Sequence, residues 1–297
     1  MKKVTLYIFL AALLFSTMEV TLKLGGNELD SFQLTFLRFM VGGLLLLPFA
    51  LAEIKHKHTV ISLKDYLYLL LLGIICIPLS MLLFQLGIMR SNASTASIII
   101  CVNPLFTMLF AHFLAGEKMT RQNGIGVVIG LIGILFMVNP FKLQEGNTPE
   151  GIILVLVGAI LFGLYSVMGK IGVEKLGIMA QTSISFIFGS LVLLVILLVT
   201  GRPVVAGIWP NNILLVLYLS IFVTGLGYLF YFLAIKKSNA TTGAITFLVK
   251  PAIAPLLAVI IIGDVITING YIGIALVLIS SYINITKKNI LHKTYKE

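Results

Sequence analysis

The 297 residues are 59% hydrophobic and only 11% charged, and the mean hydropathy is +1.09. Soluble domains carry about 25% charged residues, so this composition excludes a soluble globular protein and indicates a polytopic membrane protein. The net charge of +10 does not indicate a nucleic-acid partner, because the basic residues stand singly between apolar runs. Cys76 and Cys101 lie inside apolar runs without ligand spacing, so we expect no disulfide, no metal site and no cofactor.

Apolar runs bounded by charged residues, Gly, Pro or Asn predict ten membrane helices, because about 20 apolar residues are enough to cross a bilayer. The predicted spans cover residues 4–22, 32–52, 65–87, 93–115, 122–139, 151–170, 178–200, 212–234, 240–262 and 270–286. The polar segment from Pro140 to Glu150 is the longest connection and divides the chain nearly in half. We therefore expect a first five-helix repeat at 1–141, a second at 150–286 and a cytoplasmic tail at 287–297.

The basic residues predict the orientation, because cytoplasmic loops carry an excess of Lys and Arg. If the N-terminus is cytoplasmic, most basic residues between the spans fall on the cytoplasmic side. Those that fall outside are Lys23, Arg90, Lys142 and Arg202. The sequence therefore predicts a multi-pass protein of the cytoplasmic membrane with both termini inside the cell.

The two halves repeat with a constant separation of 147 residues. The separation joins Asn92 to Asn239, Lys23 to Lys170, Phe39 to Phe186, Pro104 to Pro251 and Gly116-Glu117 to Gly263-Asp264. One separation held through five helices indicates a duplication. Because five is odd, the copies must cross the membrane in opposite directions, which predicts an all-α fold of two inverted repeats. Inverted repeats with Pro-interrupted helices are typical of secondary transporters, whose site lies between the halves near the midplane.

Several ordered motifs resemble the EamA-type ten-helix branch of the drug/metabolite transporter superfamily over nearly the whole chain. They are LLFSTMEVTLK and ILFGLYSVMGK at the two first helices, LRF at 37–39, and NPLFTMLFAHFLAGEKMT and KPAIAPLLAVIIIGDVIT at the two fourth helices. The resemblance implies a central cavity lined by the first, third and fourth helices of each half. It also implies alternating access and export of amino acids or other metabolites.

This chain departs from the family pattern at several positions. Phe15 and Phe162 stand where members often have Trp, and Asp264 replaces the usual Glu. Lys250 occupies a position that many members fill otherwise. Glu117 and Asp264 lie at helix ends, where we expect them to cap a helix or contact a loop.

Lys250 lies near the middle of a predicted span and is followed by Pro251. A lysine at this depth costs at least about 2.5–3.5 kcal/mol on insertion scales, so it is a functional-site candidate. We expect it to meet an anionic group of the substrate or to cycle a proton. The alternative is a structural pair with Glu19 or with carbonyls freed near Pro251. Pro104 and Pro251 are the predicted hinges.

Glu19 and Arg38 lie at similar depths in the first and second spans. A buried carboxylate is costly, which suits a proton-coupling residue. The alternative is a structural Glu19–Arg38 ion pair, and the sequence leaves both open.

Other polar and aromatic residues lie on helices that the resemblance expects to line the cavity. Asn103 is the repeat counterpart of Lys250 and is predicted to bind substrate or to satisfy the helix break. The remaining substrate-binding candidates are Gln85, Tyr165, Tyr228, Phe15 and Phe162. For each of them, packing is the alternative.

The leading prediction is a secondary active transporter of a small metabolite, an amino acid or another anionic or zwitterionic solute, by proton-coupled export. A broad drug-efflux transporter is the main alternative. A passive channel would need a continuous polar stripe, and an enzyme would need a motif such as HExxH, neither of which the sequence contains. The expected partners are the substrate and the lipid bilayer. Gly126 and Gly130 on the fifth helix and Gly270 and Gly273 on the tenth predict close helix packing, and a homodimer through these faces is the alternative.

Overall fold

A computed structural model describes residues 2–25, 29–58, 60–117, 121–138, 145–208, 210 and 212–294. All regular structure within these ranges is helical, as predicted. Seven helical stretches are long and apolar enough to cross a membrane: Lys3–Leu24, Ser31–His56, Leu63–Met89, Ala93–Ala115, Pro149–Leu176, Ile178–Val199 and Ile213–Lys236. Shorter apolar helices cover Gly124–Gly133, Ile253–Ile262 and Ile268–Ser280. The chain is therefore a multi-pass membrane protein.

The first half of the chain forms eight α-helices joined by two irregular helical turns. They are α1 (Lys2–Ser16), α2 (Met18–Gly25), α3 (Ser31–His56), α4 (Leu63–Ile74), η1 (Ile75–Met81), α5 (Leu82–Met89), α6 (Ala93–Ile99), η2 (Ile100–Val102), α7 (Asn103–Ala115) and α8 (Arg121–Val138). The third helical rod, α4–η1–α5, is continuous through a π-helical stretch that contains Pro78. Pro78 leaves one backbone carbonyl of this rod without its helical donor.

The second half repeats this order. Its elements are α9 (Pro149–Leu176), α10 (Ile178–Val199), α11 (Ile213–Tyr218), η3 (Leu219–Leu226), α12 (Gly227–Lys236), α13 (Ala240–Gly243), α14 (Thr246–Ile262) and α15 (Ile268–Thr294). A π-helical stretch, η3, again interrupts the third rod. Helix α15 continues through the predicted tail as far as Thr294.

Helix ends follow from local chemistry. The side chain of Asp30 caps α3 by accepting from the backbone N–H groups of Phe32 and Gln33 at 2.9 and 3.2 Å. Gly116 and Gly263 end α7 and α14 in the left-handed region, with φ of 63° and 71°. We call α6–η2–α7 and α13–α14 the fourth rods of the two halves. A residue without Cβ adopts the left-handed conformation without strain, so both fourth rods end alike at positions separated by the repeat length.

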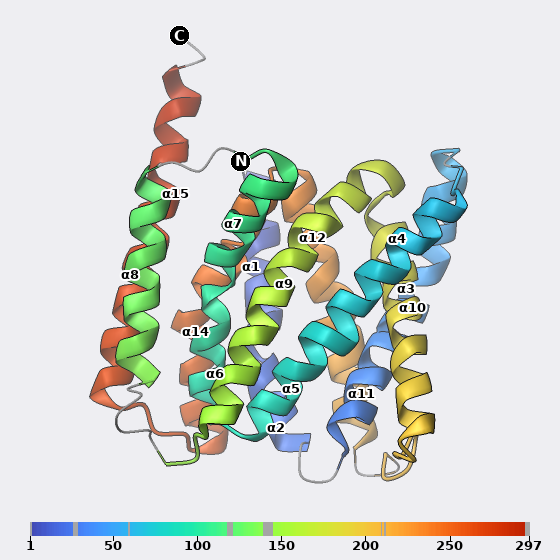
Figure 1. Ribbon diagram of the computed structural model, residues 1–297, viewed down its shortest axis with the longest axis horizontal. Helices are drawn as coiled ribbons and strands as arrows, with labels where there is room; N and C mark the ends of the chain where they lie inside the picture. Colours follow the sequence, from blue (N-terminus) through green and yellow to red (C-terminus); the bar gives the residue numbers. More distant parts are fainter. Residues whose placement is uncertain are drawn as a thin grey trace.

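The helices of the two halves pack in exchanged pairs (Figure 1). Helix α3 packs against α10, and α8 against α15. Helix α1 packs against α12 and α14, while its counterpart α9 packs against α5 and α7. Each of these contacts recurs between the equivalent helices when the two halves are swapped. The packing therefore has approximate two-fold symmetry.

Three helical segments are interrupted near the interior polar residues: α1–α2 and the two fourth rods. Thr17 separates α1 from α2. Its hydroxyl donates to the carbonyl of Leu14 at 2.8 Å and also lies 2.8 Å from the hydroxyl of Tyr218 on α11. In the first half the irregular turn η2 immediately precedes Asn103, and Pro104 lies in the first turn of α7, while its role as a hinge stays a prediction. In the second half the break lies at Ala244 and Ile245, and α14 continues through Pro251, whose side chain lies outside the described part of the structure.

The glycine faces of α8 and α15 pack against each other within the chain. The hydroxyl of Ser280 on α15 donates to the carbonyl of Gly126 on α8 at 2.6 Å. A Cβ atom added to Gly133 would lie 2.9 Å from the Cβ of Leu276. Close packing explains these glycines. A homodimer stays a prediction, and it would need a surface other than this contact.

Candidate functional site

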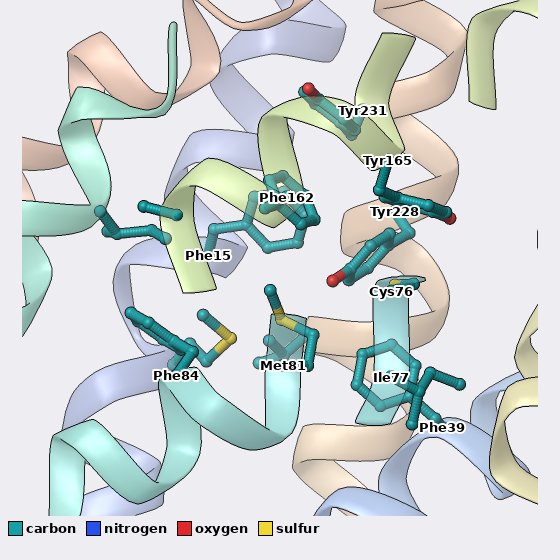
Figure 2. Close-up of a cluster of buried hydrophobic side chains, with 14 of the residues drawn as sticks. Phe15, Phe39, Cys76, Ile77, Met81, Phe84, Phe162, Tyr165, Tyr228 and Tyr231 are labelled. Carbon is teal, nitrogen blue, oxygen red and sulfur yellow. The ribbon is translucent and has the colours of Figure 1, made fainter. Parts of the chain in front are cut away.

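A cluster of buried rings, the aromatic core, occupies the centre of the bundle (Figure 2). We define it as Phe15, Phe39, Phe162, Phe186 and Tyr228. The Tyr228 ring centroid lies 5.3 Å from Phe15, 5.8 Å from Phe162, 5.7 Å from Phe39 and 4.9 Å from Phe186. Because the four phenylalanines form two repeat-related pairs, α12 brings Tyr228 to where the halves meet. Three predicted binding residues thus meet at the centre, while their contact with substrate stays a prediction.

An ion pair lies in the interior between the two halves. The ammonium of Lys250 on α14 donates to Oε1 of Glu19 on α2, and both side chains are at most 1% exposed. The ring of Phe84 on α5 lies 5.9 Å from the Lys250 nitrogen. The second carboxylate oxygen, Oε2 of Glu19, has no hydrogen-bond partner among the described residues. A buried pair holds together two groups that are each costly when left alone.

The alternative of a Glu19–Arg38 ion pair is wrong, because the partner of Glu19 is Lys250. The pair that forms is the one named as the alternative for Lys250. Arg38 instead donates from Nη1 to the sulfur of Met18 at 3.4 Å, and its guanidinium carbon lies 4.7 Å from the Phe39 ring centroid. Consecutive helical residues point about 100° apart. Met18 therefore meets α3, and Glu19 meets α14.

The repeat counterpart of this ion pair is neutral. Ser166 corresponds to Glu19, Asn103 to Lys250 and Tyr231 to Phe84. The Tyr231 hydroxyl donates to Oγ of Ser166 at 2.8 Å, and Asn103 Nδ2 donates to the carbonyl of Ala159 at 3.0 Å. Thr107 donates to Asn103 Oδ1 at 3.1 Å. The hydrogen bonds of Asn103 are thus made within the protein, and substrate binding by Asn103 stays a prediction.

Two other predicted binding residues carry poorly satisfied polar groups. Gln85 Nε2 donates weakly to the sulfur of Met89 at 3.9 Å, and its Oε1 has no partner among the described residues. The Tyr165 hydroxyl lies near Cys76 and Gln181 but makes no hydrogen bond of normal geometry. Both side chains are fully buried. Buried polar atoms are nearly always hydrogen-bonded, so these atoms are candidates for contact with a bound molecule.

Two further clusters lie at opposite ends of the bundle, each at the C-terminal end of one fourth rod. In the first, Glu117 after α7 accepts from the Thr241 hydroxyl at 2.5 Å and from Lys170 Nζ at 3.4 Å. We call Glu117, Thr241 and Lys170 the Glu117 cluster. It ties the end of α7 to the start of α13 and to α9. Contact with a loop was expected of Glu117, but Thr241 and Lys170 were not identified as its partners.

The second cluster is the repeat counterpart of the first. Oδ2 of Asp264, after α14, accepts from the backbone N–H of Ser94 at 2.9 Å. Lys23 donates to the carbonyls of Ile88 and Ser91 at 3.2 and 2.9 Å. We call Asp264, Ser94 and Lys23 the Asp264 cluster. All three residues stand 147 positions before or after members of the Glu117 cluster, so the recurrence of both charges was visible in the sequence.

Comparison with known proteins identifies the family. The model of the EamA-like transporter family matches twice, at residues 2–139 and 149–286. A protein of Clostridium kluyveri named as an uncharacterized transporter is 39% identical, over 96% of this chain and 93% of that protein. The uncharacterized transporter YyaM of Bacillus subtilis is 25% identical, over 76% of this chain and 77% of YyaM.

More distant similarity extends over the same length. The uncharacterized inner membrane transporter YedA of Escherichia coli K12 is 24% identical, over 91% of this chain and 87% of YedA. A crystal structure of a protein with 20% sequence identity superposes with a TM-score of 0.72, covering 98% of this chain and 99% of that one, and shares the fold. The resemblance seen in the sequence motifs is confirmed, and the chain belongs to the EamA-like transporter family.

Proposed function

We propose that this membrane transporter is a secondary active carrier with alternating access, built from two inverted five-helix repeats that make ten spans. It moves a small metabolite, an amino acid or another anionic or zwitterionic solute. The single observation that carries the proposal is the Glu19–Lys250 ion pair, buried between the halves. Ionisable side chains inside membrane proteins face the bundle interior and mark substrate or proton pathways.

The energetics of the pair fit a transport cycle. Removing one partner of a buried ion pair costs about 3–5 kcal/mol, because the other charge is left uncompensated. The pair therefore opens only when something replaces a partner. A proton can neutralise Glu19, and an anionic group of the cargo can compensate the positive charge that then remains in the interior. Either event links the position of the helices to the presence of a solute or a proton.

The directions of the helices support the inverted topology. In Figure 1, α1 begins at the upper edge, where α9 ends, and α3 ends near the upper edge, where α10 begins. Helix α15 also ends above this edge, and the excess of basic residues at that end supports cytoplasmic termini. Inverted repeats place the substrate site between the halves.

The Glu117 and Asp264 clusters support alternating access. Each ties the end of one fourth rod to residues of the other half, and the two lie at opposite ends of the bundle. Opening the bundle at one end breaks one cluster and leaves the other intact. With both clusters formed, Glu19 and Lys250 have no exposed surface, which corresponds to an occluded state.

Broad drug efflux is the weaker alternative. Export of lipophilic cations favours an unpaired acid in the interior, whereas Glu19 is neutralised by Lys250. The neighbouring Arg38 adds a positive charge. An interior with this balance attracts anions more than cations. Proton coupling and the export direction rest on Glu19 and on the family resemblance.

The test is a solute screen on purified protein in liposomes with an imposed pH gradient. We expect gradient-driven flux of at least one amino acid or organic anion, and loss of that flux in Lys250→Met. The matched control is Lys64→Met, which removes an exposed lysine at the start of α4. Flux that is unaffected by Lys250→Met contradicts the assigned site. Absence of any solute flux in the unaltered protein contradicts the function.

A further inference from the structure

Arg38 is the interior group whose hydrogen bonds are least satisfied. Its side chain on α3 is fully buried. Nη1 has only the weak sulfur acceptor of Met18, at 3.4 Å, while Nε and Nη2 have no hydrogen-bond partner among the described residues. Within the same ranges no carboxylate lies within ion-pair distance of it, since Glu19 is held by Lys250. A buried charge without a partner costs several kcal/mol, so its retention in the interior requires an explanation.

The open nitrogens form a specific shape. Nε and Nη2 lie on the same edge of the guanidinium plane, and their N–H bonds point outward side by side. This edge binds a carboxylate through two parallel hydrogen bonds. The opposite edge, which carries Nη1, is already turned to Met18. The vacant edge of Arg38 therefore has the geometry of a receptor for a planar oxyanion.

The charge balance selects the oxyanion. The buried charged side chains of the described interior are Glu19, Lys250 and Arg38, while Asp65 lies at the start of α4 with Lys175 as its partner. The three interior groups carry one positive charge in excess. A solute of charge −1 cancels it. A phosphate dianion would leave a buried negative charge, and a neutral solute would leave the positive one.

The surroundings of Arg38 indicate what the rest of the solute is like. The guanidinium lies over the Phe39 ring, and Phe39 contacts Phe186 at 4.8 Å and Tyr228 at 5.7 Å between centroids. These rings belong to the aromatic core and offer an apolar surface beside the guanidinium. An apolar or aromatic body can replace ring–ring contacts there without loss of polar partners.

We propose that Arg38 is the anion receptor of the transporter and that its cargo is a carboxylate of net charge −1 with an apolar body. The carboxylate binds Nε and Nη2 of Arg38, and the body lies against the aromatic core. This proposal rests on the proposed function and names the residue and the solute class for the same site. It assigns the cargo anion to Arg38 and leaves the Glu19–Lys250 pair for coupling.

The test measures binding to the purified protein in detergent, where passive leakage of organic acids through lipid has no effect. The probes are 3-phenylpropanoate, its neutral analogue 3-phenylpropanamide, and phenyl phosphate. We expect 3-phenylpropanoate to raise the unfolding temperature, with an affinity at least about tenfold above that of the amide, because only the carboxylate makes the paired charged hydrogen bonds. Equal binding of the amide, or tighter binding of phenyl phosphate, overturns the proposal.

Arg38→Lys keeps the charge but loses the two-pronged edge, so we expect it to weaken 3-phenylpropanoate binding about tenfold or more. The matched control is Arg202→Lys. Arg202 is an exposed arginine that pairs with Asp30 at 2.6 Å and lies over the Phe32 ring at 4.2 Å. We expect this control to bind as the unaltered protein does. Unchanged binding by a folded Arg38→Lys protein refutes the role of the Nε/Nη2 edge of Arg38.

A measurement on the unaltered protein guards against a variant that fails to fold. Phenylglyoxal modifies arginines, and mass spectrometry reports each site separately. We expect 3-phenylpropanoate, but not the amide, to protect Arg38 while Arg90 and Arg202 react as before. Binding and protection without solute flux in liposomes would keep Arg38 as a carboxylate receptor and reject the transport function. Flux without carboxylate binding or protection would do the reverse.

Discussion

The two repeat-related interior sites share a framework but differ in charge. In one, Lys250 meets Glu19 beside the Phe84 ring. In the other, Asn103 corresponds to Lys250 and Ser166 to Glu19, and Tyr231, whose hydroxyl binds Ser166, corresponds to Phe84. The duplicated helices thus provide two equivalent locations, and only one of them holds ionised groups.

The difference shows that the helix packing is symmetric between the halves, whereas the charged residues lie at only one of the two sites. These two features have separate roles. The helices of the two halves pack in exchanged pairs. Under the proposed alternating access, this packing would let the bundle open at either end by equivalent motions. Identical sites in both halves would respond alike to a proton or an anion in the two open states. With a single charged site, a proton or an anion acts on one of the two locations only, so the two halves respond differently to it.

The largest expected effect comes from removing the charge at the first site. Lys250→Met leaves Glu19 buried without a partner, so we expect a loss of about 3–5 kcal/mol of stability together with loss of transport. The double variant Glu19→Gln, Lys250→Met removes both charges. It should regain most of the stability but not the transport. Unfolding in denaturant and flux in liposomes measure the two properties, and recovery of both in the double variant would reduce the pair to a structural contact.

An intermediate effect is expected from the two end clusters. Glu117→Gln weakens charge-assisted bonds to Lys170 and Thr241, worth about 1.5–3 kcal/mol each at most, so the bundle should open more often at that end. Asp264→Asn should favour opening at the other end. Opening from one end or the other should expose Cys101, which is buried at the interface near Asn103.

The measurement is the rate at which a membrane-impermeant thiol reagent labels the protein from each side. Cys76→Ser removes the second thiol and serves as the background for both variants. We expect Glu117→Gln to speed labelling of Cys101 from one side and Asp264→Asn from the opposite side. Faster labelling from the same side in both variants would show that the clusters are not opposed gates.

The fold was largely predictable because the signals for it are local. Hydropathy marks each span within its own segment, and the recurrence of Pro104 as Pro251 and of Gly116 as Gly263 needs only the residue order. The break in the second fourth rod was less well placed, since it lies at Ala244 and Ile245 rather than at Pro251. Proline removes one hydrogen bond, but α14 continues through Pro251, so proline alone does not mark where the helix is interrupted.

The partners in the site were harder to predict because they depend on helix rotation. Depth along the helix correctly made Glu19 and Arg38 neighbours, but a shift of one residue turns a side chain by about 100°. The break at Thr17 sets that rotation and directs Glu19 to Lys250, 231 residues away in sequence. The same limit applies to Thr241 and Glu117, which come from different halves.

The smallest effect tests the neutral site. Tyr231→Phe deletes the hydroxyl that donates to Ser166 and makes this position match Phe84 of the charged site. Because one neutral hydrogen bond is lost, we expect a loss of about 0.5–1.5 kcal/mol of stability, measured by denaturant unfolding. Transport should persist, since no charge has changed. A loss of transport as large as that of Lys250→Met would mean that the neutral site also takes part in handling the solute, and that the contrast between the two sites is one of degree only.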